Sequence, residues 1–525
     1  MDLKLILVFA LINNIYAAKK CIVVLDRGDE YIECKNIVSL ASIISEWQPS
    51  WETLRVVNER EYKLLIADLP RRSIITSLKK LDLSNAGNIR VTGDGFKQYD
   101  SLRSLNLSNT GLDEIDDSWF PSRLTKLDLS RNDLNSDVLD DLRKLNQITD
   151  LRLASNAISA VDSELFGKMR KLTRLDLSFN EFQRIKDVGR IPKLEHLKMT
   201  DNMIAEVTNE DLADLPKLQT LDIGFNVIDR IEEGSFSMLP ELEEIDLDGN
   251  VLTNIPPNLF GGITSRSFRR LSLKGNKVKR LEGFQSLNRL MELDLSGNIL
   301  EDLSQSSFSG LDSLRLLNLS NNAILNIQSS TFGPLPSLEI LDLSGNRLQT
   351  LDGNIFGSSG AHLKQLLLAK NNLGVLQPHL FDPIGNVRVV DVSFNKLTYF
   401  DENVFPPLRK INKFFLSHNS IEHFPLKAYE LLRTLTEVAI DHNKLTFLLS
   451  PTTNVRRLRK ISLQGNPWQC PCFDEITNFL AQKSVNYMNG LNFDGQKPLC
   501  VHTKFAFCIK DLQKVKEERI VPPSE

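Results

Sequence analysis

The stretch that decides the fold is Leu172-Thr-Arg-Leu175-Asp-Leu177-Ser-Phe-Asn180-Glu-Phe182. It follows the pattern L-x-x-L-x-L-x-x-N-x-L, with apolar residues at the first, fourth, sixth and eleventh places and asparagine at the ninth. Successive side chains of a strand point to opposite faces, so Leu175 and Leu177 point to one side and Asp176 to the other. The pattern therefore predicts a short strand with one buried face.

This frame recurs along most of the chain, with 22 to 26 residues between the starts of successive copies. One copy cannot bury its own apolar face, and stacking places each strand about 4.8 Å from the next. Asparagine holds the ninth place in fifteen copies, from Asn132 to Asn466, where its amide can hydrogen-bond the turn backbone of neighbouring copies. The seventeen copies begin at Leu78, Leu102, Leu124, Ile148, Leu172, Leu194, Leu218, Leu242, Phe268, Leu290, Leu314, Leu338, Leu363, Val387, Ile411, Leu435 and Leu458.

Phenylalanine forms a second column, eighteen residues after the start of a copy. Rings at one register predict a continuous apolar spine beneath the convex side of the stack, each ring contributing about 1.5–3 kcal/mol of burial. Leu212 and Tyr429 fill the same place in two other copies. The column consists of Phe96, Phe120, Phe166, Phe236, Phe260, Phe308, Phe332, Phe356, Phe381 and Phe405.

The cysteines lie only near the two ends of the chain, because residues 35–469 contain none. This placement predicts two capping elements closed by disulfides, which form in an oxidising compartment. Cys21 and Cys34 suit a small hairpin closed by one bridge. The other four, Cys470, Cys472, Cys500 and Cys508, permit three pairings, and a zinc site is the rival interpretation.

The first residues point to the same compartment. The apolar run 5–12 is followed by small residues at Ala17 and Ala18, which predicts a secretory signal peptide over residues 1–17; the alternative is a buried N-terminal strand. No other stretch is long and apolar enough for a transmembrane anchor, so we expect a secreted, extracellular protein. The net charge of −4 over 525 residues lacks the basic excess that binding of nucleic acid requires.

The repeats resemble those of the leucine-rich repeat superfamily, of the extracellular 24-residue type, over residues 78–466. This resemblance implies an α/β horseshoe solenoid with a parallel concave sheet, about 17 repeats, and disulfide-bonded caps at both ends. The segment Asn466-Pro-Trp-Gln-Cys470-Pro-Cys472 resembles the cysteine-rich C-terminal flank of such proteins, which implies the bridges Cys470–Cys500 and Cys472–Cys508.

The expected domain organisation follows from these features. It comprises a signal peptide at 1–17, an N-terminal cap with a possible degenerate repeat at 18–77, repeats at 78–466, the cysteine-rich flank at 467–510 and a tail at 511–525. Ile476, Phe479 and Leu480 have helical spacing and predict a helix that covers the last repeat.

The chain contains no H-E-x-x-H, G-x-S-x-G or phosphate-binding G-x-x-x-x-G-K-S/T pattern. We therefore expect no enzymatic activity and no cofactor, and we expect the concave face to bind a partner. The second, third, fifth, seventh and eighth places of each repeat should form that face. Aspartate is frequent at the fifth place, where it either solvates the sheet, binds a basic partner or orders the ladder of strands.

Four successive repeats carry Lys370, Phe394, His418 and His442 at the eighth place, with Phe415 close by at a fifth place. Exposed aromatic and histidine side chains resemble the anchors of protein interfaces, so these five residues are the predicted protein-binding site. The alternative is that the rings only pack on their neighbours. Separately, Asn106 and Asn318 begin N-x-S acceptor sequences and are predicted glycosylation sites on the concave sheet.

The predicted function is that of a secreted protein-binding scaffold. The chain resembles the mosquito leucine-rich repeat immune proteins, in particular the members without a coiled coil, because the tail after the cysteine-rich flank is too short for one. The resemblance implies innate immune recognition or regulation, with complement-like proteins or other leucine-rich repeat proteins as partners. The alternative is an extracellular adhesion or matrix role, or developmental signalling.

Overall fold

The structure is a computed structural model. It describes residues 21–26, 29–59, 62–68, 75–256, 259–260, 267–281, 284–285, 287–357, 359–449, 455–487 and 500–517. The predicted signal peptide at 1–17 and the end of the predicted tail, from residue 518, lie outside the described residues. The chain divides into two compact units, Met1–Asp246 with Ile263–Arg266, and Leu247–Gly262 with Ser267–Glu525. Each unit is described by itself.

The first unit begins with an antiparallel hairpin of β1 (Cys21–Asp26) and β2 (Asp29–Lys35), in which Cys21 lies opposite Cys34. Strand β2 then pairs in parallel with β3 (Thr53–Val57), which pairs in parallel with the first repeat strand. The repeat strands of this unit are β5 (Lys80–Asp82), β7 (Ser104–Asn106), β8 (Lys126–Asp128), β9 (Asp150–Arg152), β10 (Arg174–Asp176), β11 (His196–Lys198), β13 (Thr220–Asp222) and β15 (Glu244–Asp246).

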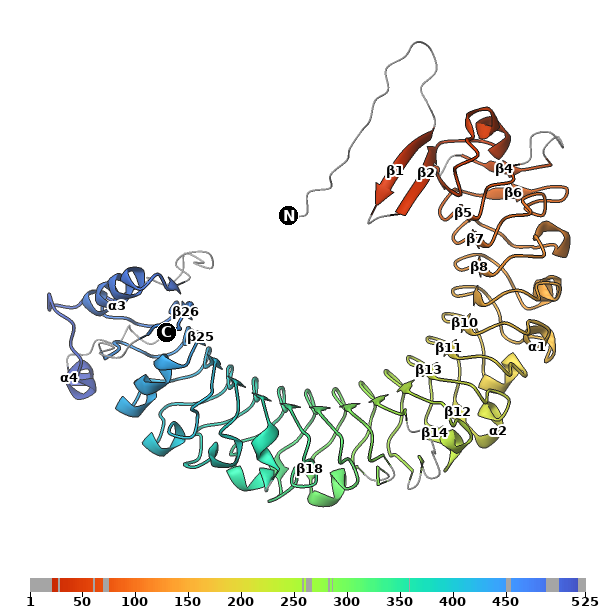
Figure 1. Ribbon diagram of the computed structural model, residues 1–525. Coiled ribbons are helices and arrows are strands. Elements are labelled where there is room, and N and C mark those ends of the chain that lie inside the picture. The colour runs from red at the N-terminus through yellow and green to blue at the C-terminus, as the bar shows by residue number, and fades with distance from the viewer. Residues whose placement is uncertain are drawn as a thin grey trace, which may run out of the picture. The chain divides into compact units, whose positions relative to one another are not determined.

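Short elements complete the first unit on the side away from these strands (Figure 1). The minor strand pairs are β4 (Leu64–Ile66) with β6 (Ile89–Val91), and β12 (Glu206–Val207) with β14 (Arg230–Ile231). The helices are η1 (Leu40–Glu46), η3 (Asp117–Trp119), η4 (Asp137–Leu142), α1 (Leu165–Lys168), η5 (Ile185–Val188), α2 (Asn209–Leu212) and η6 (Ser235–Met238), where η marks a 3₁₀ helix.

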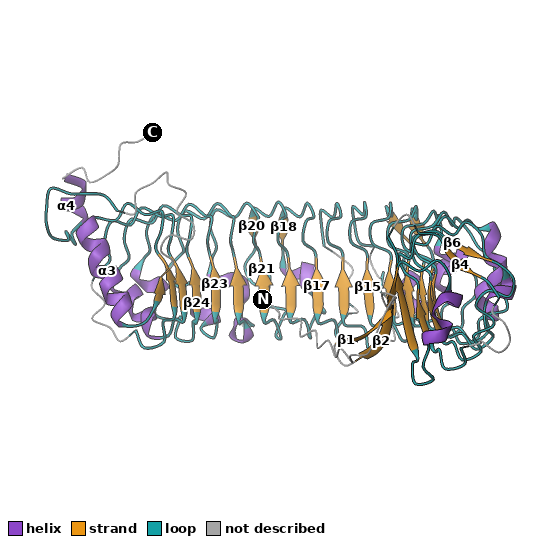
Figure 2. Ribbon diagram, turned by 90° about the horizontal axis from the view of Figure 1, so that it is seen from above, coloured by secondary structure: helices purple, strands orange, loops and turns teal. Residues whose placement is uncertain are grey.

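The second unit continues the same pattern, and Figure 2 shows its strands β17, β21, β23 and β24 as parallel arrows in one row. Each strand that belongs to a repeat spans the third to fifth places of that repeat, and equivalent residues pair, as in Val389–Lys413. The strands are β16 (Arg270–Ser272), β17 (Glu292–Asp294), β19 (Leu316–Asn318), β21 (Ile340–Asp342), β22 (Gln365–Leu367), β23 (Val389–Asp391), β24 (Lys413–Phe415), β25 (Glu437–Ala439), β26 (Lys460–Ser462) and β27 (Asn486–Tyr487).

The second unit has its own minor strands and helices. Strand β18 (Asp302–Leu303) pairs with β20 (Asn326–Ile327). The helices are η7 (Gln305–Phe308), η8 (Gly353–Phe356), η9 (Gly360–His362), η10 (Asp382–Ile384), η11 (Glu402–Val404), η12 (Leu426–Arg433), α3 (Cys470–Gln482) and α4 (Leu512–Glu517). No helix in the described ranges combines the length and apolar character needed to cross a bilayer.

The asparagine column forms the predicted hydrogen bonds between repeats. In one repeat, the Nδ2 group of Asn395 donates to the carbonyls of Leu368 and Val392 at 2.9 and 3.0 Å. Its Oδ1 atom accepts the backbone N–H of Leu373 at 2.9 Å. One buried amide thus satisfies groups of its own repeat and of the preceding one, which fixes the spacing between repeats.

The phenylalanine column forms the predicted buried spine. Phe308 and Phe332 are essentially without solvent exposure, and their ring centroids lie 5.7 Å apart. The next ring, Phe356, lies 6.1 Å from Phe332. Helices η7 and η8 end at Phe308 and Phe356, so the 3₁₀ turns carry these rings into the interior.

The disulfides are Cys21–Cys34, Cys470–Cys500 and Cys472–Cys508, as predicted. Because all four C-terminal cysteines are bridged, the rival interpretation of a cysteine zinc site is wrong. Helix α3 carries two of these cysteines and is the predicted covering helix, with Leu480 on its buried side.

A buried ion pair joins two repeats of the first unit. The Arg184 guanidinium donates to the Asp211 carboxylate at 2.9 Å, and Thr208 donates to it from both its backbone N–H and its hydroxyl at 2.7 Å. Burial alone would raise the pKa of Asp211, but the hydrogen bonds from Arg184 and Thr208 outweigh it, so this pKa lies below its ordinary value. The ionised carboxylate therefore stabilises the folded unit.

Candidate functional site

The eighth place of each repeat lies on the turn that follows a strand and not on the strand itself. The strands end at the fifth place, and three residues later the backbone is left-handed: φ is +56° at Lys370, +55° at Phe394, +55° at His418 and +51° at His442. Glycine and asparagine adopt such a φ most easily, and glycine stands there in several other repeats, as at Gly345 and Gly465. Larger side chains at this place are therefore a departure from the local preference.

Backbone hydrogen bonds hold these turns in register. The N–H of Phe394 donates to the carbonyl of Ser417 at 2.9 Å, and the N–H of His418 donates to that of Asp441 at 3.0 Å. The N–H of His442 donates to the carbonyl of Gln464 at 2.8 Å. Because each turn is bonded to the next in the same way, their eighth-place side chains project side by side.

The result is a stack of side chains, which we call the C-terminal ladder, made of Lys370, Phe394, His418 and His442. The rings of Phe394 and His418 have centroids 4.2 Å apart and planes 10° apart, and His418 stacks on His442 at 4.2 Å and 8°. The Lys370 Nζ atom lies 6.0 Å from the Phe394 centroid. Phe394 nevertheless stays 47% exposed, so the rings pack on their neighbours and also present a surface to solvent.

Phe415, the last of the five predicted protein-binding residues, is not part of this stack. Phe415 lies on strand β24, between Asp391 and Ala439 of the adjacent strands, and its side chain is half-buried. The ladder residues lie on the turns beyond the strands. Phe415 therefore belongs to the sheet face next to the ladder and not to the stack itself.

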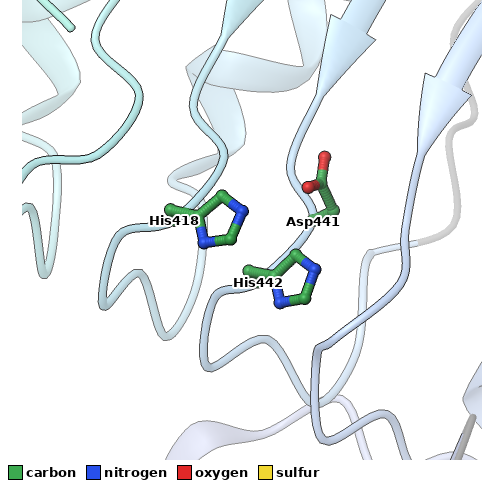
Figure 3. Close-up of side chains that lie close together, drawn as sticks. All are labelled: His418, Asp441 and His442. Carbon is green, nitrogen blue, oxygen red and sulfur yellow. The ribbon is translucent and has the colours of Figure 1, made fainter. Parts of the chain in front are cut away.

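A buried carboxylate that sequence reasoning missed lies beside the ladder. Asp441 is at the seventh place of its repeat and is 8% exposed (Figure 3). Its Oδ1 atom accepts a hydrogen bond from the hydroxyl of Ser417 at 2.6 Å and another from Ser462. The sequence does hold a signal that could have identified Asp441. Ser393 and Ser417 hold the equivalent place in the two preceding repeats, and an acidic residue at this place is unusual.

The environment of His418 favours its neutral form. Partial burial lowers the pKa of His418, the neighbouring His442 lowers it further, and Asp441 opposes both effects. Near neutral pH the stacked ring is therefore an uncharged imidazole with one nitrogen lone pair available.

The other polar residues singled out in the sequence, the fifth-place aspartates and the two acceptor asparagines, lie on the strands. Fifth-place aspartates order their own repeats, since Asp391 Oδ1 accepts the N–H of Ser393 at 2.9 Å. Asn106 and Asn318 lie on β7 and β19, and the Nδ2 atom of Asn318, which a glycan would require, donates to Asp294 Oδ2 at 3.0 Å. Glycosylation at both asparagines stays a prediction.

Solved structures with the same fold provide a comparison. A leucine-rich repeat protein of Leptospira interrogans is 20% identical with a TM-score of 0.59, and the match covers 86% of this chain and 99% of that one. The Drosophila Toll–Spatzle complex gives 18% identity and a TM-score of 0.62, covering 87% of this chain and 68% of that one. A TDR receptor gives 21% identity and a TM-score of 0.52, and the match covers 76% of this chain and 78% of that one.

These likenesses agree with the parallel sheet and the repeat architecture. No curated protein sequence matches the chain. The family described as "Leucine rich repeat" matches in eight segments that together cover residues 100–421. That is more than half of the sequence, and the chain is therefore a member of the leucine-rich repeat family.

Proposed function

We propose that this protein is an extracellular, non-enzymatic scaffold that binds a protein partner at the C-terminal ladder. The observation that carries the proposal is the exposed, stacked arrangement of Phe394 and His418. Aromatic side chains supply much of the energy of protein interfaces, and rings already held in a stack lose little conformational freedom on binding. Phe415, on the adjacent sheet face, is included as a flanking contact.

Two further features support the proposed extracellular location. All three disulfides close elements at the ends of the chain, and such bonds persist in oxidising compartments. The sequence of residues 1–17 is that expected of a secretory signal peptide.

We place the function within innate immune recognition or regulation. This rests on the resemblance to the coil-less mosquito leucine-rich repeat immune proteins, which makes complement-like proteins or other leucine-rich repeat proteins the first partners to test. The Toll–Spatzle complex, whose fold is similar, is described as a hub in Drosophila development and innate immunity.

The test is affinity capture of the tagged, secreted protein from extracellular fluid, followed by mass spectrometry. The test variant is the double substitution Phe394→Asn with His418→Asn, because asparagine tolerates the left-handed backbone and already stands at this place in Asn321. The matched control is Phe179→Asn with Phe225→Asn. These two rings occupy the same turn position and are 54% and 60% exposed, but Asp201 separates them along the column.

We expect the ladder variant to lose partners that the wild type and the control both retain, with secretion equal for all three. An unchanged partner set in the ladder variant would contradict the placement of the site. Recovery of the protein mainly with cells or matrix would instead favour the adhesion role.

A further inference from the structure

The two histidines of the ladder and the buried carboxylate beside them form a cluster of metal-ligand type. One nitrogen each from His418 and His442 and one carboxylate oxygen of Asp441 all lie within 4.8 Å of one another. Figure 3 shows both rings with Asp441 to the side of the stack. We propose that these three residues bind a divalent first-row transition-metal ion, of the type represented by Zn²⁺.

The carboxylate is the strongest part of the argument. Asp441 is buried, and among the described residues no lysine or arginine forms an ion pair with it. Buried charges in proteins are normally paired with an opposite charge or coordinate a metal. A cation bound between Asp441 and the two imidazoles would supply the missing positive charge.

The carboxylate is also oriented in the way that metal ligands usually are. The hydroxyls of Ser417 and Ser462 both donate to Oδ1, and no hydrogen bond to Oδ2 occurs within the described part of the chain. Hydrogen bonds from outside the ligand set fix a ligating carboxylate and tune its affinity. The second oxygen keeps its lone pairs for an ion.

A buried side-chain oxygen on the next turn also supports a bound cation. Gln464 holds the place of Asp441 in the next repeat, and its buried Oε1 atom has no hydrogen-bond partner among the described residues. Its backbone carbonyl accepts the N–H of His442, so the two turns are directly bonded. An unsatisfied acceptor on the adjoining turn is consistent with a positive charge close by.

The backbone permits the two rings to reach this position. A Cβ atom added at Gly465 would lie 2.4 Å from His442 Nδ1, so the absence of a side chain there makes room for the imidazole. The rings are nearly parallel, and their in-plane lone pairs converge on one ion only after a tilt of the rings. Both histidines are exposed, so a tilt has room on the solvent side, and it exchanges part of the ring stacking for bonds to the ion.

The ligand types define the class of ion. Imidazole nitrogen suits zinc, copper, nickel and iron, whereas calcium and magnesium prefer all-oxygen sites. Three protein ligands leave at least one coordination position for water.

The test is titration of Zn²⁺ into the full secreted protein, carrying no histidine tag and freed of metal by chelator, at pH 7.5 in a calorimeter. The ligand variants are His418→Phe and His442→Phe, which keep a ring in the stack and use a residue that the chain itself places at this turn in Phe394. Asp441→Asn removes the charge but keeps an oxygen for the serine hydroxyls. The control is His379→Asn, because His379 also has a left-handed backbone and contacts a carboxylate, Asp382, at 2.9 Å.

We expect the wild type and the control to bind one equivalent of Zn²⁺. Loss of a group that merely supports a ligand weakens metal binding about 10–100-fold, so loss of a ligand should weaken it about 100-fold or more. Zn²⁺ should also raise the unfolding temperature of the wild type and the control, but not that of the ligand variants.

Several outcomes would overturn the proposal. One is the absence of stoichiometric binding to the wild type, and another is unchanged binding by the double variant His418→Phe with His442→Phe. Loss of binding in His379→Asn alone would assign the ion to a different site. If Asp441→Asn fails to fold, the two phenylalanine variants still test whether the histidines bind the ion, since they leave the buried carboxylate and its serine partners intact.

Discussion

Phe332 lies between two other rings of the buried spine, and truncating it provides a quantitative test of the repeat energetics. Its centroid is 5.7 Å from that of Phe308 and 6.1 Å from that of Phe356, and all three side chains are buried. Replacing a buried phenylalanine by alanine costs about 3–5 kcal/mol. Aromatic pairs contribute about 0.5–1.5 kcal/mol each beyond burial, so Phe332→Ala should lie at the upper end of that range.

A double-mutant cycle can isolate the interaction energy between the rings of Phe308 and Phe332. Phe308→Ala and Phe332→Ala remove the same ring contact, so the double variant should lose less stability than the two single losses combined. The difference should be about 0.5–1.5 kcal/mol. Phe332→Leu is the matched control, because Leu212 fills the equivalent place in another repeat, and it should cost less than the alanine variant.

Chemical denaturation measures the free energies, and hydrogen exchange locates the damage. In a repeat protein the interaction energy is shared between nearest neighbours, so protection should fall most around β19, β21 and η8. A single unfolding transition with an unchanged midpoint would refute the spine as a source of stability. Protection lost evenly through the second unit would refute the nearest-neighbour description.

Three further perturbations address other parts of the molecule. Asn395→Ala leaves the buried N–H of Leu373 without its acceptor, and chemical denaturation should show a loss of about 1–3 kcal/mol; an unchanged midpoint would mean that water replaces the amide. Cys472→Ser with Cys508→Ser opens the C-terminal cap, and hydrogen exchange should show a loss of about 2–5 kcal/mol confined to the last repeats rather than shared by the whole chain. Asp211→Asn should cost about 1.5–3 kcal/mol at pH 7. The pKa of Asp211 is lowered in the folded state, so its stabilisation is present above the unfolded pKa of about 3.9 and is lost as the pH falls through the folded value. Urea unfolding should therefore show the stability difference between the wild type and this variant shrinking as the pH falls below about 3.9, and a constant difference would contradict the ion-pair account.

The sequence by itself was sufficient for the repeat architecture, because its determinants are local and recur in every copy. The strand leucines, the ninth-place asparagine and the phenylalanine column each meet an equivalent residue about 24 positions away. A shift in register would break all these contacts together, so the pattern permits one stacking arrangement. The C-terminal disulfide pairing followed instead from the resemblance to the flank of extracellular leucine-rich repeat proteins, since four cysteines alone leave three pairings open.

The candidate site depended on the tertiary structure. The sequence placed Lys370, Phe394, His418 and His442 at one register, but it did not show that their backbone is left-handed or that the rings stack. It also did not reveal Asp441, because the surroundings of that carboxylate are assembled from different repeats: Ser417 precedes it by one repeat, and Ser462 follows it by one. Residues so far apart in the chain become neighbours only when the repeats stack, and the distance between their polar atoms then decides whether they can share an ion.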